Sequence, residues 1–159
     1  MKKLLTKKIA IIFSIVFVLC VITATTCFAL MPKANLKPSD YDRGLTYEQA
    51  VNEGKPILAL FYVDWCAYCK RFVPKYDKVR TLNPLNFNFV MINAEDPANS
   101  EIVREYKISG YPTVYIIDPK YDYHSHIDYP FMETVGKLNK EVASYKNLRK
   151  IIDKADSCK

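Results

Sequence analysis

The sequence predicts an α/β domain in which a mixed sheet of four to five strands is flanked by helices. Short apolar segments that are typical of strands alternate with longer segments whose apolar residues recur every three or four positions, as in helices. The run Ile57 to Val63 is apolar at every position, which is typical of a strand buried on both faces. A hairpin and then a final helix are expected at the end of the chain, which also agrees with an α/β fold.

The first helix and the first strand are expected next to each other. Residues 45–53 favour a helix, with Thr46 as its N-cap and Gly54 where a left-handed residue often ends a helix. The strand at 57–63 follows almost at once. From Cys66 to Leu82 the apolar residues recur at helical spacing, so a second helix should begin where the buried strand ends.

The remaining elements continue the alternation to the end of the domain. They are a strand over 87–93, a helix over 98–106 that begins at Asp96-Pro97 and closes near Gly110, strands over 113–117 and 123–127, and a helix over 139–155. The turn at 118–120 is short, so its two strands should pair as an antiparallel hairpin with the second strand at the sheet edge. The domain is therefore expected over residues 45–155, with a tail over 156–159.

The N-terminal 29 residues predict an export signal. Four lysines, at positions 2, 3, 7 and 8, precede an apolar, uncharged stretch over 9–31. That stretch is long enough to cross a bilayer, which takes about 20 apolar residues, whereas Cys27-Phe28-Ala29 fits a cleavage site. Residues 1–29 are thus expected to be a cleaved signal peptide or an N-terminal membrane anchor, and lipidation at Cys27 is a poorer third alternative.

The lysines predict which side of the membrane the domain occupies. Positive residues before an apolar span stay in the cytoplasm, so the rest of the chain should lie outside the cytoplasm. The stretch from Lys33 to Asp42 is polar and predicts a linker, which we expect over residues 30–44. The formal charge of +6 falls to +2 without the four lysines, so the basic composition does not indicate nucleic acid binding.

Two cysteines lie at the junction of the buried strand and the second helix. Outside the N-terminal segment the chain has only Cys66, Cys69 and Cys158, too few for a domain held together by disulfides. The first turn of a helix favours a thiolate at Cys66, which predicts that Cys66 is the nucleophile. Cys69 lies one turn further on and would be the resolving thiol.

Other roles are open for the cysteines outside the N-terminal segment. The pair could be buried structural cysteines, or half of a zinc site that recruits His124 and His126, although an edge strand would hold these histidines away from the thiols. Cys158, near the C-terminus, is expected to be a free tail thiol, with pairing between chains as the alternative. The oligomeric state is not predicted.

Three motifs in order resemble the thioredoxin superfamily over about residues 46–152. They are Trp65-Cys66-Ala67-Tyr68-Cys69-Lys70, Pro74 eight residues after the first cysteine, and Gly110-Tyr111-Pro112-Thr113 before a strand. With Gly54-Lys55-Pro56 and Asp64-Trp65-Cys66, the sequence is most similar to exported bacterial members such as the C-terminal domain of the thiol:disulfide interchange protein. The resemblance implies a thioredoxin fold, a cis Pro112, and a substrate groove framed by Tyr111 and Pro112. Trp65 and Tyr68 are expected as exposed contacts for a partner beside this groove; the alternatives are that Trp65 is a packing residue and that Tyr68 has no role.

The resemblance also implies the activity. The expected function is a thiol:disulfide oxidoreductase, favoured as a reductase because no histidine lies between the cysteines. Its reacting group would be the Cys66–Cys69 pair, with no separate cofactor and no metal. Expected partners are protein thiols and disulfides and an upstream electron donor or acceptor, with membrane attachment through residues 9–31. The alternatives are a thioredoxin-fold protein that handles copper or zinc and a binding protein without catalysis.

Two positions depart from the family pattern. Thioredoxins carry a buried Asp six residues before the first cysteine, and this chain has Leu60 there. The Lys that family members tend to carry on the neighbouring strand corresponds to Met91. Deprotonation of Cys69 would then depend on Asp64 or water, so we expect dithiol chemistry without the internal base of thioredoxins.

Overall fold

The computed structural model describes residues 14–16, 36–128 and 132–157. The chain divides into two units, Met1–Ala34 and Asn35–Lys159, and in the first unit only the helical residues 14–16 are described. The expected signal or anchor otherwise lies outside the described residues, as does Cys158. No helix among the residues that the structure describes is both long enough and apolar enough to cross a membrane.

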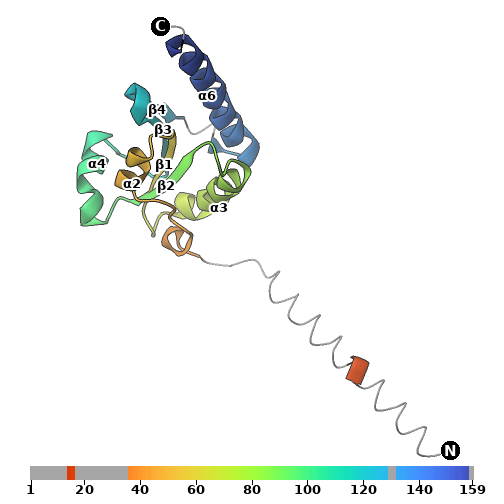
Figure 1. Cartoon of the computed structure of the whole chain (residues 1–159). Helices are drawn as coiled ribbons and strands as arrows, with labels where there is room; N and C mark the ends of the chain where they lie inside the picture. Colours follow the sequence, from red (N-terminus) through yellow and green to blue (C-terminus); the bar gives the residue numbers. More distant parts are fainter. Residues whose placement is uncertain (1–13, 17–35, 129–131, 158–159) are drawn as a thin grey trace, which may run out of the picture. The chain divides into compact units, whose positions relative to one another are not determined.

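Four strands form one mixed sheet in the order β2-β1-β3-β4 (Figure 1). The central strand β1 (Ile57–Tyr62) pairs in parallel with β2 (Asn88–Asn93) and antiparallel with β3 (Thr113–Asp118). The last strand, β4 (Tyr123–Ile127), pairs antiparallel with β3 and lies at the edge. The predicted thioredoxin fold, its hairpin and the edge position of the last strand are confirmed.

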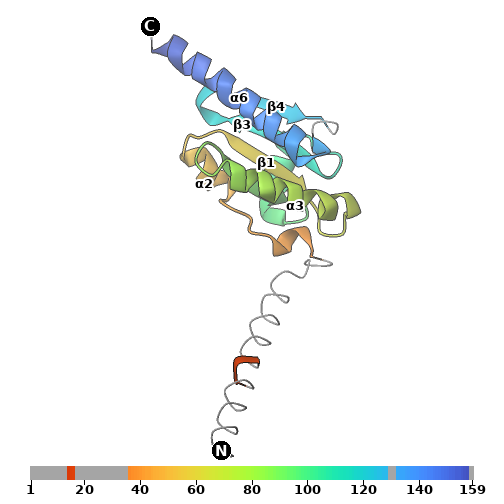
Figure 2. The same ribbon diagram turned by 90° about the vertical axis from the view of Figure 1, so that its right-hand side faces the viewer.

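Helices cover both faces of the sheet. On one face, residues of β1 share a buried cluster with α3 (Ala67–Leu82) and α6 (Val135–Asp156), which lie together over the sheet in Figure 2. On the other face, β1 packs with α2 (Tyr47–Asn52) and α4 (Ser100–Glu105). All six residues of β1 are fully buried, because each of its two faces meets a helical layer.

The first two helices, α2 and α3, lie where the sequence predicted them. The Thr46 side chain accepts a hydrogen bond from the backbone N–H of Gln49, and the Gln49 side chain accepts one from the Thr46 N–H, so the two satisfy both free donors at the start of α2. Gly54 follows with a positive φ of 64°. Helix α3 runs from Ala67 to Leu82 with Pro74 inside it.

Two helix boundaries differ from the prediction. The helix expected over 98–106 is divided into a 3-10 turn, η2 (Pro97–Asn99), and α4, which ends at Glu105, before the expected close near Gly110, and is followed by Lys107 with φ 49°. The last helix begins at Val135, earlier than the expected residue 139. Its N-cap is Thr134, whose side chain accepts a hydrogen bond from the Lys137 N–H, and Gly136, a poor helix former, lies in the first turn.

The end of the predicted linker packs against the domain. A 3-10 turn, η1 (Pro38–Asp40), buries Pro38, and the carbonyl of Arg43 accepts a hydrogen bond from the Met91 N–H. Gly44 forms a bridge with Val90, with φ 70°, and a Cβ there would lie 2.2 Å from the Phe89 carbonyl oxygen. Arg43 and Gly44 therefore contact β2, a contact that the polar composition of the segment does not reveal.

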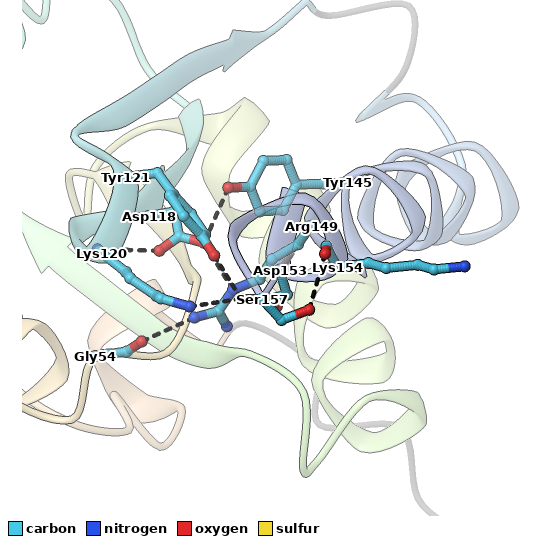
Figure 3. A network of polar contacts seen from close by, with 9 residues as sticks. All are labelled: Gly54, Asp118, Lys120, Tyr121, Tyr145, Arg149, Asp153, Lys154 and Ser157. Carbon is cyan, nitrogen blue, oxygen red and sulfur yellow. Dashed lines mark hydrogen bonds and ion pairs between the residues drawn. The ribbon is translucent and has the colours of Figure 1, made fainter. Parts of the chain in front are cut away.

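The buried carboxylate of Asp118 connects α6 with β3 and, through Arg149, with the loop before β1 (Figure 3). Asp118 is fully buried at the end of β3; its Oδ2 accepts a hydrogen bond from the Tyr145 hydroxyl at 2.9 Å and lies 3.0 Å from Nε of Arg149. Its Oδ1 accepts one from the Lys120 N–H at 3.1 Å. Arg149 also donates to the carbonyl of Gly54 at 3.0 Å, just before β1. One arginine thus links α6, the β3–β4 turn and the loop before β1.

Loss of Arg149 should destabilise the domain by about 3 kcal/mol, because a buried carboxylate would keep only neutral partners. We expect Arg149→Leu to lower the free energy of unfolding by this amount in urea titrations followed by circular dichroism. Lys150→Leu, which changes the exposed neighbouring residue, is the matched control and should shift it by less than about 0.5 kcal/mol. Equal effects of the two substitutions would contradict a structural role for this ion pair.

Candidate active site

Cys66 lies where β1 ends and α3 begins, as the sequence predicted. It is the N-cap of α3, and its Sγ accepts a hydrogen bond from the backbone N–H of Cys69 at 3.2 Å. Cys66 retains 6% of its surface exposed, whereas Cys69 has none, and both are free thiols in this structure. The geometry therefore leaves Cys66 as the sulfur of the pair that an external disulfide can reach.

The loop before β3 brings a backbone acceptor to Cys66. The Tyr111–Pro112 peptide bond is cis, which confirms the expectation for Pro112. The carbonyl oxygen of Tyr111 lies 3.5 Å from the Sγ of Cys66 and accepts a hydrogen bond from its thiol. The structure thus brings together the CxxC motif and the proline loop, which are 45 residues apart in the sequence.

The environment of Cys69 is apolar. Burial, reinforced by the adjacent Cys66 side chain, raises the pKa of the Cys69 thiol from an ordinary value of 9.0 to about 12. Leu60 and Met91, which replace the Asp and Lys of the family pattern, are paired across β1 and β2 and belong to the same buried cluster as Cys69. The structure therefore provides no carboxylate at the place where thioredoxins have one.

Asp64, the other base that the sequence suggested, is held by a residue that was not predicted. Its Oδ1 accepts a hydrogen bond from the Ser39 N–H at 2.9 Å, and its Oδ2 accepts one from the Ser39 hydroxyl at 2.6 Å. Ser39 belongs to η1, in the segment predicted as linker, and no sequence signal connects it to Asp64. The carboxylate is half-buried and anchors the N-terminal segment of the domain beside the thiols.

The two aromatic residues expected at the rim are exposed. Trp65 has 69% of its surface exposed and donates a hydrogen bond from Nε1 to Glu95 at 2.8 Å. Tyr68 has 58% exposed, and the guanidinium carbon of Arg71 lies 4.7 Å from its ring centroid. Both side chains therefore lie at the surface beside the thiols, where a partner protein can contact them.

A small pocket adjoins this rim. It has a volume of about 140 Å³ and is lined by Tyr68, Arg71, Phe72, Lys75, Pro112, Met132 and Glu133. Sequence reasoning placed Tyr68 and Pro112 at the site but missed the others. The spacing of Arg71 and Lys75 from Tyr68 on a predicted helix was a usable signal, whereas Met132 and Glu133 come from a distant segment and had none.

The histidines considered as metal ligands are remote from the thiols in the sheet. His124 and His126 are exposed on the edge strand β4, and β3 separates them from β1. His126 packs against Tyr115, with ring centroids 5.3 Å apart. Among the residues that the structure describes, no group of three or more His, Cys, Asp and Glu side chains could hold a metal ion.

Comparison with known proteins places these features in one family. The family model described as Thioredoxin matches residues 41–143. Human protein disulfide-isomerase A4 is 27% identical over 119 residues, and thioredoxin-like protein HCF164, chloroplastic, of Arabidopsis thaliana is 32% identical over 74 residues. These matches cover 69% and 46% of this chain but only 18% and 28% of the relatives. The chain therefore spans less than a third of the length of either.

A solved structure shows the same fold. The first thioredoxin domain of mouse protein disulfide-isomerase A4 superposes with a TM-score of 0.54 at 24% identity. The match covers 64% of this chain and 73% of that domain's chain.

The two thiols should differ strongly in reactivity. With a pKa of about 12 in place of 9.0, Cys69 has about a thousandfold less thiolate at neutral pH, and it is fully buried. We expect iodoacetamide to alkylate Cys66 at least about 100-fold faster than Cys69 in the reduced, folded chain at pH 7.5, as measured by peptide mass spectrometry. In urea the rates should converge, and similar rates in the folded chain would contradict the burial of Cys69.

Proposed function

The chain belongs to the thioredoxin family, and on that premise we propose that it is an exported thiol:disulfide oxidoreductase that acts as a reductase of protein disulfides. The observation that carries this proposal is the position of Cys66. Its sulfur receives a backbone hydrogen bond at the start of α3, keeps a small exposed surface, and faces the Tyr111–Pro112 loop. Cys69, shielded behind it, supplies the second thiol of the pair.

The reaction proceeds by two exchanges of sulfur partners. The Cys66 thiolate attacks one sulfur of a substrate disulfide, the substrate S–S bond breaks, and the departing substrate thiolate takes up a proton. Cys69 then loses its proton to solvent and attacks the sulfur of Cys66 in the mixed disulfide. The second substrate thiol leaves, and the Cys66–Cys69 disulfide remains. Two electrons pass to the substrate, and an upstream donor must restore the dithiol.

The first exchange requires a free Cys66 sulfur and a docked substrate chain. The exposed rings of Trp65 and Tyr68 provide the contact surface beside that sulfur. The backbone of Tyr111 is the proposed partner of the substrate main chain, because its carbonyl already lies next to Cys66. No cofactor beyond the thiol pair is needed for this chemistry.

The second exchange requires deprotonation of a buried thiol. The raised pKa of Cys69 and the apolar side chains of Leu60 and Met91 oppose this step. Formation of the Cys66–Cys69 disulfide removes Cys69 from the titration, since only the reduced form carries its proton. Resolution of the mixed disulfide should therefore be the slower exchange, and it should accelerate as the pH rises toward 12.

The proposed direction and location rest on sequence features. Ala67 and Tyr68 separate the cysteines, so no histidine between them stabilises the Cys66 thiolate, and this favours a reductase over a strong oxidant. The four lysines before the apolar stretch over 9–31 support export, to the periplasm or the outer face of a bacterial cytoplasmic membrane.

The reduction potential of the Cys66–Cys69 pair tests the proposal. Trp65 is the single tryptophan and adjoins Cys66, so its fluorescence should report the redox state of the full chain equilibrated in glutathione buffers. We expect a potential near that of thioredoxin, about −270 mV. A value near about −120 mV would identify an oxidant. Failure to form the disulfide at any glutathione ratio would overturn the redox function and favour the metal-handling alternative.

Single substitutions should separate the roles of the two thiols. Cys69→Ser should accumulate a stable mixed disulfide between Cys66 and a protein substrate, visible by non-reducing electrophoresis, because the resolving step is removed. Cys66→Ser should form no such adduct and should lose activity to background. An adduct of equal yield in both variants would contradict the assignment of Cys66 as nucleophile and Cys69 as resolving thiol.

A further inference from the structure

One face of α3 next to the thiols carries a basic pocket. Tyr68, Arg71, Phe72 and Lys75 occupy the spacing i, i+3, i+4 and i+7, so they share a face of the helix. That face lines the 140 Å³ pocket together with Pro112, Met132 and Glu133. Because Pro112 belongs to the loop whose Tyr111 carbonyl faces Cys66, the pocket directly adjoins the site of disulfide exchange.

The two cations of this pocket are not neutralised. All 17 acidic residues of the sequence lie within the described residues, and none of the ion pairs formed there involves Arg71 or Lys75. Lys75 donates from Nζ to the backbone carbonyl of Glu133 at 2.5 Å and makes no direct ion pair with the Glu133 carboxylate. That carboxylate pairs with Lys137 at 2.7 Å, and Lys137, with a smaller contribution from the charge of Lys75, lowers the pKa of Glu133.

The rest of the pocket is apolar. Phe72 and Met132 are 5% and 3% exposed and provide a hydrophobic lining. The Arg71 guanidinium is held over the exposed ring of Tyr68, so it lies at the surface beside the pocket. A pocket of this size takes one side chain, and its composition suits an aliphatic stem that ends in a carboxylate.

The other acidic side chains near the thiols do not compensate this pocket. The Asp64 carboxylate accepts both of its hydrogen bonds from Ser39, and Glu95 accepts one from the Trp65 indole. Neither lines the pocket. A substrate that approaches Cys66 along the side of Tyr68 and Pro112 therefore meets Arg71 and Lys75, and the one carboxylate that lines the pocket, Glu133, is paired with Lys137.

We propose that this pocket selects substrates in which an acidic residue, preferably Glu, neighbours the reacting cysteine. The substrate side chain lies against Phe72 and Met132, and its carboxylate pairs with Arg71 and Lys75. The selection rests on the proposed disulfide exchange and adds to it a substrate class. The pocket affects how the substrate docks, because complementary charge speeds the encounter of substrate and protein and fixes the orientation of the substrate. The exchange of sulfur partners itself is unchanged.

Peptide disulfides that differ in one residue test this selection. Three peptides of equal length would carry Glu, Gln or Lys next to the cysteine in an otherwise neutral sequence, each as its disulfide. The reduced full chain should react with the Glu peptide about 10-fold faster than with the Lys peptide at low ionic strength, with the Gln peptide between them. The difference should shrink when the ionic strength is raised from about 0.01 M to 1 M, because salt screens exposed charges.

Charge reversal identifies the residues responsible. The double variant Arg71→Glu and Lys75→Glu should reverse the order of the peptides, whereas Arg71→Lys and Lys75→Arg should keep it. Lys146→Glu and Lys150→Glu on α6 is the matched control: it makes the same change in net charge, involves no residue of this pocket, and should leave the order unchanged. Circular dichroism checks that each variant is folded.

The outcomes separate this inference from the function on which it rests. Equal rates for the three peptides, or an order that the α6 control reverses as strongly as the pocket variant, would overturn the selection while disulfide exchange stands. No reaction with any peptide, including the neutral one, would instead count against the proposed reductase. If the preference persists unchanged at high salt, charge pairing is not its cause and the inference fails.

Discussion

The burial of β1 on both faces is the constraint on which the rest of this structure depends. A strand of six fully buried residues has to end where the sheet ends, and the chain that leaves it turns directly into α3. Cys66 is the N-cap at the end of that turn, so the packing of the core sets where the nucleophile lies. The Tyr111–Pro112 loop meets Cys66 at this junction because it leads into the neighbouring strand β3.

The same burial makes the thiol of Cys69 difficult to ionise. Cys69 points into the cluster shared by β1 and α3, where apolar side chains stand in place of the family's charged pair. A thiol there is well protected from outside reagents but is difficult to ionise. The two cysteines of one short motif thus have opposite properties: Cys66 receives a helix N–H and has some exposed surface, whereas Cys69 is fully buried and Leu60 stands where the family has a carboxylate. This asymmetry suits a sequence of attack by Cys66 followed by resolution by Cys69.

Charged residues in this domain act mainly away from the sulfur atoms. At one end of the sheet, Asp118 and Arg149 hold α6 against the loop before β1. Near the thiols, Asp64 is occupied by Ser39, which attaches the start of the domain to the rim of the site. Arg71 and Lys75 remain without acidic partners among the described residues, and they lie where a substrate would approach. The domain therefore separates structural ion pairs from charges available for recognition.

The sequence by itself determined the order of strands and helices, the buried central strand, and the placement of Cys66 and Cys69 at its end, because these follow from local periodicity, capping residues and short motifs. It also indicated the loop at Pro112, through the likeness of that motif to a known family. Tertiary structure alone decided that Ser39 holds Asp64, that Met132 and Glu133 complete a pocket with α3, and that Arg43 and Gly44 contact β2. Those contacts join segments far apart in the chain through single side chains or backbone groups, and an isolated hydrogen bond leaves no periodic pattern in the sequence. Local pattern could therefore locate the reacting sulfur atoms, whereas the surroundings that govern their ionisation and their choice of substrate arise only when the chain folds.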